Sequence, residues 1–168
     1  STSTQNYLKA IWGLKEWSSE PVTATLIAKQ LGLKLSSVSD AVRKMSKQGL
    51  VSHTPYGSVE LTELGRQYAL VMVRRHRLLE SFLVQALGYT WDEVHNEAEN
   101  LEHAVSDMLI ERVDKFLDYP TRDPHGDPIP TVDGQITIPS AHRLTDSGAQ
   151  SQVTVERISD SDPQLLAF

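Results

Sequence analysis

The segment TATLIAKQLGLKLSSVSDAVRKMSKQGLVSHTPYGSVEL, residues 23–61, decides the fold of the N-terminal part of the chain. Thr23 can cap one short helix, and Ser36 or Ser37 can cap a second helix that stops at Gly49. In the second helix the apolar side chains lie on one face, and the serines and basic residues lie on the others. Two short helices around a tight turn predict a helix-turn-helix.

A small hairpin is predicted directly after these two helices. Residues 50–53 and 58–61 alternate in polarity or are rich in β-branched side chains, and a turn at 55–57 separates them. Residues 4–17 carry apolar side chains at steps of three and four, which indicates an amphipathic helix before the motif. Because a helix-turn-helix followed by a hairpin is the order of a winged helix, we expect such a domain over residues 1–73.

The composition is that of a folded protein without cysteine chemistry. The 168 residues, 39% hydrophobic and 23% charged, allow one ordinary domain or two small ones. The lack of cysteine excludes a disulfide framework, a cysteine zinc finger and a thiol nucleophile. The sequence shows neither an apolar stretch long enough to span a membrane nor the pattern of a signal peptide. We therefore expect a cytoplasmic protein that has no membrane partner.

Charge is distributed unevenly along the chain. Residues 1–73 carry a formal charge of +3, whereas residues 74–168 carry −9. A basic N-terminal half suits a polyanion, and a helix at 36–47 with serine and basic side chains can enter the major groove of double-stranded DNA. An ordinary amphipathic surface helix has the same pattern when taken alone. Its place in a winged helix favours DNA contact.

The second half of the chain predicts helices followed by an irregular segment. Thr62 can cap a long helix that ends near Leu87, and helices at 91–103 and 106–117 follow it. The proline-rich segment 119–130 cannot be helical, so we expect a structured loop or linker there.

Three regions are expected along the chain, and the fold class is mainly α. The winged helix at 1–73 is followed by a helical domain at 74–140, and residues 141–168 form a linker and the start of an incomplete module. Residues 153–158 are a strand candidate in that module. An isolated strand has no partner for its backbone, which is why the module is expected to be incomplete.

The predicted helix at 91–103 carries a stripe of candidate metal ligands. At about 100° per residue, its two histidines and two of its four glutamates fall within an arc roughly 100° wide that borders the buried face. On the preceding helix a histidine and a glutamate four residues apart share a face. The six donors are His76, Glu80, His95, Glu99, Glu102 and His103. Without sulfur they suit Mn²⁺, Fe²⁺, Co²⁺ or Zn²⁺, and three carboxylates favour the harder ions.

Two other interpretations compete with a regulatory metal site. Glutamates at helical spacing are often only a solvated acidic face, although three histidines joining three carboxylates favour metal. A helical di-iron site needs glutamate followed after three residues by histidine on two helices, and a zinc hydrolase of this kind needs histidine, glutamate and histidine at positions i, i+1 and i+4. The sequence has neither spacing. We therefore expect no enzyme. The other histidines, His53, His125 and His142, are interpreted as surface or loop residues.

Five segments carry a resemblance to a known family: YLKAIW (7–12), VRRHRLLE (73–80), WDEVHNEAE (91–99), EHAVSD (102–107) and DPHGDPIP (123–130). The chain resembles the diphtheria toxin repressor family of metal-dependent regulators, most of all its actinobacterial manganese transport regulators. The resemblance implies a DNA-binding transcriptional repressor of metal-ion homeostasis. It also implies a homodimer formed by the helices around 88–117, and a C-terminal SH3-like β domain that is truncated here.

The resemblance implies two metal sites in the helical domain. The matching residues are His76, Glu80 and His95 for the ancillary site, and Asn6, Glu99, Glu102 and His103 for the primary site. Iron-type members have a cysteine where this chain has Glu99, and loss of that soft donor favours manganese. The implied cofactor is therefore Mn²⁺, with Fe²⁺ as the alternative and Zn²⁺ or Co²⁺ as substitutes in vitro.

The resemblance also implies which residues face DNA and how metal acts. The matching positions are Thr25, Ser36, Ser37, Ser39, Asp40 and Lys44, with Thr4 as a backbone contact. We add Arg43 from its place on the same helix. Metal binding is expected to fix the first helix and to order two winged helices at a spacing that fits a palindromic operator. No small-molecule substrate is expected.

Overall fold

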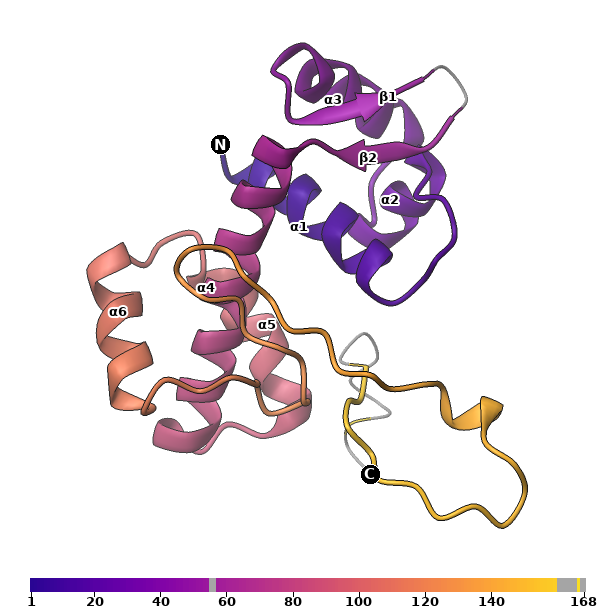
Figure 1. Ribbon diagram of the computed structural model, residues 1–168. Helices are drawn as coiled ribbons and strands as arrows, with labels where there is room; N and C mark the ends of the chain where they lie inside the picture. Colours follow the sequence, from indigo (N-terminus) through magenta and orange to yellow (C-terminus); the bar gives the residue numbers. More distant parts are fainter. Residues whose placement is uncertain (55–56, 160–165, 167–168) are drawn as a thin grey trace. The chain divides into compact units, whose positions relative to one another are not determined.

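The computed structural model describes residues 1–54, 57–159 and 166 (Figure 1). Its chain divides into two compact units, Ser1–Val73 and Arg74–Phe168. The described elements are six α-helices, a two-stranded sheet and a short 3-10 helix, in the order α1 α2 α3 β1 β2 α4 α5 α6 η1. The mainly helical fold class predicted from the sequence is confirmed.

The first unit is a helix-turn-helix with a two-stranded wing. Its elements are α1 (Thr2–Glu16), α2 (Ala24–Leu31), α3 (Leu35–Lys47), β1 (Val51–His53) and β2 (Val59–Leu61). The strands are antiparallel, with Val51 opposite Leu61. The apolar faces of the helices and the sheet meet in one core, which includes Leu8, Ile11, Ile27, Val38, Val42, Met45 and Val59. The predicted winged helix is confirmed.

Capping residues set the starts of the helices in this unit. Thr23 Oγ1 accepts a hydrogen bond from an amide in the first turn of α2 at 3.2 Å, as the sequence predicts. The prediction that Ser36 or Ser37 caps α3 is wrong. The extended residue before α3 is Lys34, so both serines lie inside the first turn, where a helical backbone cannot serve as an N-cap. Residues 55 and 56 of the predicted turn lie outside the described residues.

The long helix α4 (Glu63–Leu87) contains the boundary between the two units. Thr62 caps it by accepting a hydrogen bond from Gly65 N at 3.1 Å. Gly65 packs closely against the backbone of Leu50, the residue before β1. A β-carbon on Gly65 would lie 1.9 Å from Leu50 O. The helix ends at Gly88, whose φ of 74° favours a residue without a β-carbon. Both ends agree with the prediction. No described helix, α4 included, is long and apolar enough to cross a membrane.

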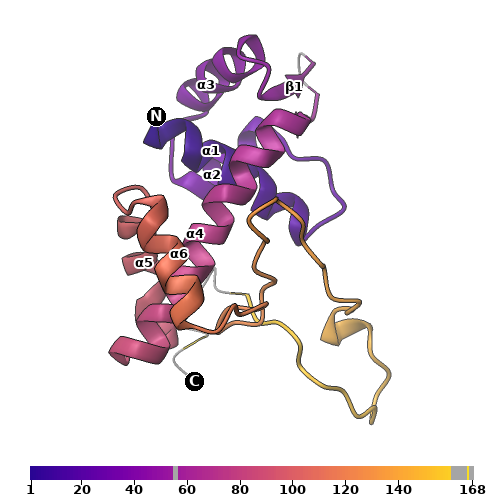
Figure 2. The same cartoon turned by 60° about the vertical axis from the view of Figure 1, so that its left-hand side comes forward.

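The second unit packs α5 (Trp91–Leu101) and α6 (Asp107–Phe116) beside the C-terminal part of α4 (Figures 1 and 2). Its core includes Leu78, Leu79, Leu83, Val94, Ala98, Ile110, Val113 and Ile129. α5 ends two residues earlier than the sequence predicts, because the amides of Ala104 and Val105 both donate to Leu101 O and close a turn. The candidate ligands at 102 and 103 therefore lie just after the helix.

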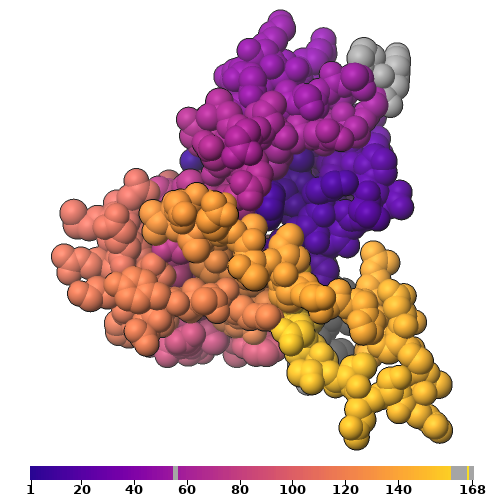
Figure 3. Space-filling model, in the orientation of Figure 1, coloured from indigo at the N-terminus to yellow at the C-terminus, as the bar shows by residue number. Residues whose placement is uncertain are grey.

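The proline-rich segment after α6 is an ordered loop, as predicted. An isolated β-bridge joins Arg122 and Pro128, and Ile129 packs into the core of the unit. The loop lies at the surface of the unit next to α6 (Figure 3). Its order comes from packing and from hydrogen bonds that fix its backbone.

The predicted strand at 153–158 is wrong for the described structure, in which these residues have no regular secondary structure. A strand needs a neighbour along its length. Among the described residues, the segment's backbone bonds to another backbone only at Ile158 N, which donates to His125 O at 2.9 Å. The 3-10 helix η1 (Leu144–Asp146) lies earlier in the same region. The expected SH3-like module at 141–168 stays a prediction.

Candidate metal centre

Two histidines and a glutamate from α4 and α5 form the centre of a buried cluster. His76 Nε2 lies 3.0 Å from Glu80 Oε1, one turn further along α4. From α5, His95 Nδ1 lies 3.2 Å from His76 Nε2 and 3.3 Å from Glu80 Oε1. Glu80 and His76 are buried. The donors that the sequence places on facing helices are therefore in contact.

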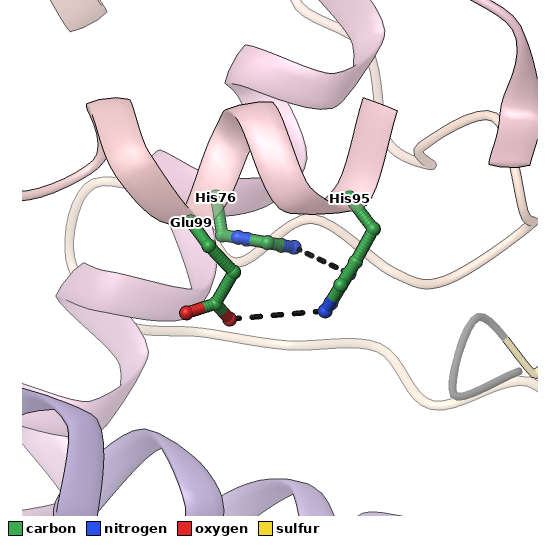
Figure 4. A group of neighbouring side chains, drawn as sticks. All are labelled: His76, His95 and Glu99. Carbon is green, nitrogen blue, oxygen red and sulfur yellow. Dashed lines mark hydrogen bonds and ion pairs between the residues drawn. The ribbon is translucent and has the colours of Figure 1, made fainter. Parts of the chain in front are cut away.

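Glu99 joins this cluster one turn after His95 on α5 (Figure 4). Its Oε1 lies 3.8 Å from His95 Nε2. One ligand atom from each of His76, His95 and Glu99 lies within 4.8 Å of the others. This spacing allows two imidazole nitrogens and a carboxylate oxygen to share a cation.

In the turn after α5, Glu102 contacts the other ring nitrogen of His76, and His103 contacts Glu102. Glu102 Oε2 lies 2.7 Å from His76 Nδ1, and Glu102 Oε1 lies 3.4 Å from His103 Nε2. His76 therefore bridges two fully buried carboxylates, Glu80 and Glu102. The six predicted donors form one continuous network, and their division into two sites stays a prediction.

The buried carboxyl of Glu80 is kept in its charged form by the histidines around it. Burial alone would raise its pKa, but the charge of His76 and hydrogen bonds from His76 and His95 outweigh burial and hold the pKa well below its usual range. His125 lowers that pKa further through its charge. A carboxylate that stays ionised in the interior is a ready ligand for a cation.

Asp123 and His125, in the loop after α6, extend the cluster beyond the predicted set. His125 Nδ1 lies 3.8 Å from Glu80 Oε2, and ligand atoms of Glu80, Asp123 and His125 lie within 4.8 Å of one another. His125 lies in the proline-rich loop, as predicted, but it is not a surface residue, because its exposed fraction is only 2%. His142 is exposed and His53 is half-buried.

The loop is organised by Asp123 itself. Its Oδ1 accepts hydrogen bonds from His125 N and Asp127 N, both at 2.9 Å. Burial, followed by the charges of Glu80 and Asp127, raises the pKa of Asp123 to about 8. A bound cation would replace that proton and relieve the repulsion between the carboxylates. The sequence signal was the motif DPHGDP at 123–128, in which aspartates flank the histidine on both sides.

Arginines of α4 hold the segments that carry these ligands. Arg75 donates to Glu102 O at 3.3 Å and so closes the turn after α5. Arg77 NH1 donates to Pro128 O at 2.6 Å, and its Nε lies 3.7 Å from Asp123 Oδ2. Such supporting contacts orient metal ligands and tune their affinity.

Three buried donor atoms of the cluster have no hydrogen-bond partner among the described residues: Glu80 Oε2, Asp123 Oδ2 and His125 Nδ1. An unpartnered buried polar atom costs about 1–3 kcal/mol, so such atoms are rare. All three atoms are of the kind that binds divalent cations, and the set contains oxygen and nitrogen without sulfur. The residues present therefore fit a metal ion.

Asn6, the predicted ligand from the first helix, lies on α1 in the first unit. Its Oδ1 is buried and accepts no hydrogen bond from the described residues. An amide oxygen is a neutral donor and therefore a weaker ligand than a carboxylate. Its contribution to metal binding stays a prediction.

The predicted DNA-facing side chains lie at the surface of the first unit. Those that are exposed are Thr25, Ser36, Ser37, Asp40, Arg43 and Lys44, and those that are half-buried are Thr4 and Ser39. Arg43 forms an ion pair with Asp40 on the outer face of α3, where each side chain is 70% exposed. Lys44 is exposed beside it, so α3 presents basic groups to solvent.

The first unit is a winged helix, and the second unit holds a buried cluster of histidines and carboxylates. Residues 1–59 match the family model described as iron dependent repressor, N-terminal DNA binding domain. Residues 62–131 match the model described as iron dependent repressor, metal binding and dimerisation domain. The chain therefore belongs to the iron-dependent repressor family, which includes the diphtheria toxin repressor. This is a family of transcriptional repressors and not of enzymes, which removes the metalloenzyme alternative.

Individual relatives agree with this assignment. The iron-dependent repressor IdeR of Mycobacterium tuberculosis is 40% identical over 128 residues, covering 76% of this chain and 55% of the relative. The chain thus spans little more than half the length of that relative. A solved manganese-dependent transcriptional repressor in complex with manganese is 54% identical, with a TM-score of 0.93 over 98% of this chain and 75% of that one. The solved structure of ScaR with bound Cd²⁺ is 33% identical, with a TM-score of 0.84 over 98% of this chain and 76% of that one. The family resemblance predicted from the sequence is confirmed.

Proposed function

We propose that this protein is a manganese-responsive transcriptional repressor that controls metal-ion homeostasis. The observation that carries the proposal is the buried cluster with donor atoms that lack hydrogen-bond partners among the described residues, on the same chain as a winged helix. A repressor acts where the chromosome is, so we place the protein in the cytoplasm.

We assign two metal sites within the cluster. The first comprises Asn6, Glu99, Glu102 and His103, and the second comprises His76, Glu80 and His95, which we extend by Asp123 and His125. The extension is supported by the ligand atoms of Glu80, Asp123 and His125, which lie within 4.8 Å of one another. Bound metal supplies the positive charge that balances the clustered carboxylates. Asn6 then ties α1, and with it the winged helix, to the ligands of the second unit.

The proposed assembly is a homodimer on a palindromic operator. The outer face of α6 exposes Met108 at 69%, Leu109 at 45% and Phe116 at 66%, within the domain that matches the family's dimerisation domain. Large exposed apolar side chains on one helix mark an interaction surface. Because a two-fold dimer presents its winged helices symmetrically, it reads two inverted half-sites.

Manganese is the metal best supported by the donor set. The cluster has no sulfur donor, and Glu99 supplies a carboxylate where iron-type members have cysteine. The similar solved repressor with manganese favours the same ion. IdeR is iron-dependent by name, so an iron-responsive regulator of the same family is the second candidate.

A direct test of the function is to select genomic DNA fragments with the protein, once with Mn²⁺ and once with a chelator. We expect the Mn²⁺ selection to enrich a small set of fragments that share an inverted repeat, and the chelator selection to enrich none of them. Parallel selections with Fe²⁺ under anaerobic conditions and with Zn²⁺ compare the metals. Equal enrichment with and without chelator would rule out metal-dependent repression.

Lys44→Ala and Arg43→Ala are each expected to weaken DNA binding and to reduce its dependence on salt. Each phosphate contact that is lost should reduce the slope of log affinity against log salt by about one unit. The measurement is fluorescence anisotropy of labelled operator over a salt series. Lys15→Ala, which removes an exposed charge at the end of α1, is the control. If both α3 variants match Lys15→Ala, this helix does not contact DNA.

Glu99→Cys is expected to shift metal activation from Mn²⁺ toward Fe²⁺ or Co²⁺. A thiolate prefers softer ions than a carboxylate does, while the neighbouring His76 and His95 are unchanged. The measurement is the concentration of each metal that gives half-maximal operator binding. Glu97→Cys adds the same thiol two residues earlier on α5, away from Glu99, and should leave the order of metals unchanged. The same order in both variants would show that Glu99 does not determine selectivity.

A further inference from the structure

Residues 156–158 lie along the loop that carries Asp123 and His125. Ile158 N donates to His125 O at 2.9 Å, so the two backbones are in direct contact. Arg157 Nε donates to Asp127 Oδ1 at 2.6 Å, and Arg157 NH2 lies 2.5 Å from the same oxygen. We call residues 156–158 the strap.

The strap and the loop fit closely at one glycine. Gly126 has a φ of 89°, and a β-carbon built on it would lie 2.0 Å from Glu156 O. Any other side chain there would push the strap away from the loop and strain the backbone as well. The local sequence therefore allows the two segments to approach closely, because a glycine lies between the histidine and the aspartate that the strap contacts.

Two charge contacts between the strap and the loop differ in their exposure. Arg157 and Asp127 have side chains that are only 9% and 4% exposed, whereas Arg122 and Glu156, joined at 2.7 Å, are 40% and 45% exposed. Asp127 Oδ2 also lies 3.6 Å from Arg77 NH2. Removing Arg157 takes away the nearer cation of this buried carboxylate, and the loss of a buried charged partner has a large effect. An exposed pair contributes little. Of these two charge contacts, the one made by Arg157 therefore holds the strap to the loop more strongly.

Asp127 connects this contact to the candidate ligands. Its amide donates to Asp123 Oδ1 at 2.9 Å, the same oxygen that receives the amide of His125. A shift of Asp127 therefore displaces both Asp123 and His125 relative to Glu80. We propose that Arg157 is a positioning residue, through which the strap sets the affinity of the metal site formed by Glu80, Asp123 and His125. This inference rests on the proposed function, which places a metal there.

The test is calorimetric titration of the metal-free protein with Mn²⁺, comparing Arg157→Ala with the parent protein. We expect Arg157→Ala to weaken one of the two binding events about tenfold or more, the effect typical of losing a partner behind a metal ligand, and to leave the other unchanged. Arg157→Lys keeps the charge and should restore part of the affinity, which guards against a variant that simply fails to fold. Arg122→Ala, which removes the exposed charge contact between loop and strap, is the matched control and should stay within about twofold.

Two further measurements separate this inference from the proposed site. His125→Ala should eliminate the binding event that Arg157→Ala weakens. Hydrogen exchange of the metal-free protein should show faster exchange at Ile158 and Asp127 in Arg157→Ala than in Arg122→Ala. The Ile158 amide donates to the loop, and the side chain of Asp127, whose amide donates to Asp123, is held by Arg157. If His125→Ala loses a metal but Arg157→Ala binds like the parent, the site stands and the positioning role is overturned. If His125→Ala binds every metal as the parent does, the proposed site is overturned together with the role of Arg157.

Discussion

Glu102→Gln is expected to abolish operator binding at Mn²⁺ concentrations that saturate the parent protein. The carboxylate of Glu102 is fully buried and contacts His76 at 2.7 Å and His103 at 3.4 Å. Loss of an outer partner of a metal ligand alone costs about 10- to 100-fold in affinity, so loss of a charged ligand is expected to cost about 100-fold or more. Glutamine keeps the size of the side chain, which limits the effect on packing.

This variant needs two readouts and a matched control. Calorimetry should show the loss of Mn²⁺ affinity, and anisotropy with labelled DNA should show the loss of operator binding. Glu111→Gln removes an exposed carboxylate from α6 in the same unit and is expected to behave like the parent. Retention of parental Mn²⁺ affinity in Glu102→Gln, with normal thermal unfolding, would contradict the assignment of Glu102 as a ligand.

Changes at Asn6 are expected to shift the metal dependence of DNA binding in opposite directions. Asn6 is the candidate ligand that lies on α1 in the DNA-binding unit, whereas the others belong to the second unit. Moving a population from about 1% to 99% DNA-competent requires roughly 5.5 kcal/mol of preference for the competent state. A side chain that holds the metal equally well in both states contributes nothing to this preference. A metal-binding side chain on the DNA-binding unit is therefore the simplest source of the preference.

Asn6→Asp should therefore lower the Mn²⁺ concentration needed for operator binding, because a carboxylate holds the cation more strongly than an amide. Asn6→Ala should raise that concentration more than it weakens Mn²⁺ binding itself. Gln5→Glu places the same new charge one residue earlier, about 100° around the helix, and should have little effect. Identical DNA midpoints in all of these proteins would mean that α1 takes no part in the switch.

The local rules of helix ends account for most of what could be predicted. Thr23 and Thr62 cap α2 and α4, and Gly88 ends α4, as their sequence positions indicate. The prediction for α3 failed because serine is a good N-cap in general, while the start of this helix is set by the extended backbone of Lys34. The capping preference of serine identifies candidate N-cap residues, and the packing of the folded chain determines where the helix begins.

The ligand cluster was predictable where a regular helix fixes the spacing of its side chains. His76 and Glu80 on α4, and His95 and Glu99 on α5, meet because residues four apart share a helical face. His125 was missed because its burial depends on how an irregular loop packs. No periodicity describes that loop, so only its motif of aspartates around a histidine could have marked it.

The strand expected at 153–158 shows the same limit for β structure. Its β-branched residues are typical of a strand, but a strand forms only with a partner, which a single segment does not reveal. In the described structure this segment instead contacts the loop of His125 through Ile158 and Arg157. A segment that the sequence assigns to another module thus touches the candidate metal centre.

The central claim is that metal binding and DNA binding are linked, and linkage is reciprocal. The most direct measurement is the Mn²⁺ affinity of the protein determined twice, without DNA and with saturating operator DNA, alongside the operator affinity with and without Mn²⁺. We predict that operator tightens Mn²⁺ binding by the same overall factor by which Mn²⁺ tightens operator binding, and that non-operator DNA of equal length does not. An Mn²⁺ affinity that is the same with and without operator would contradict the account.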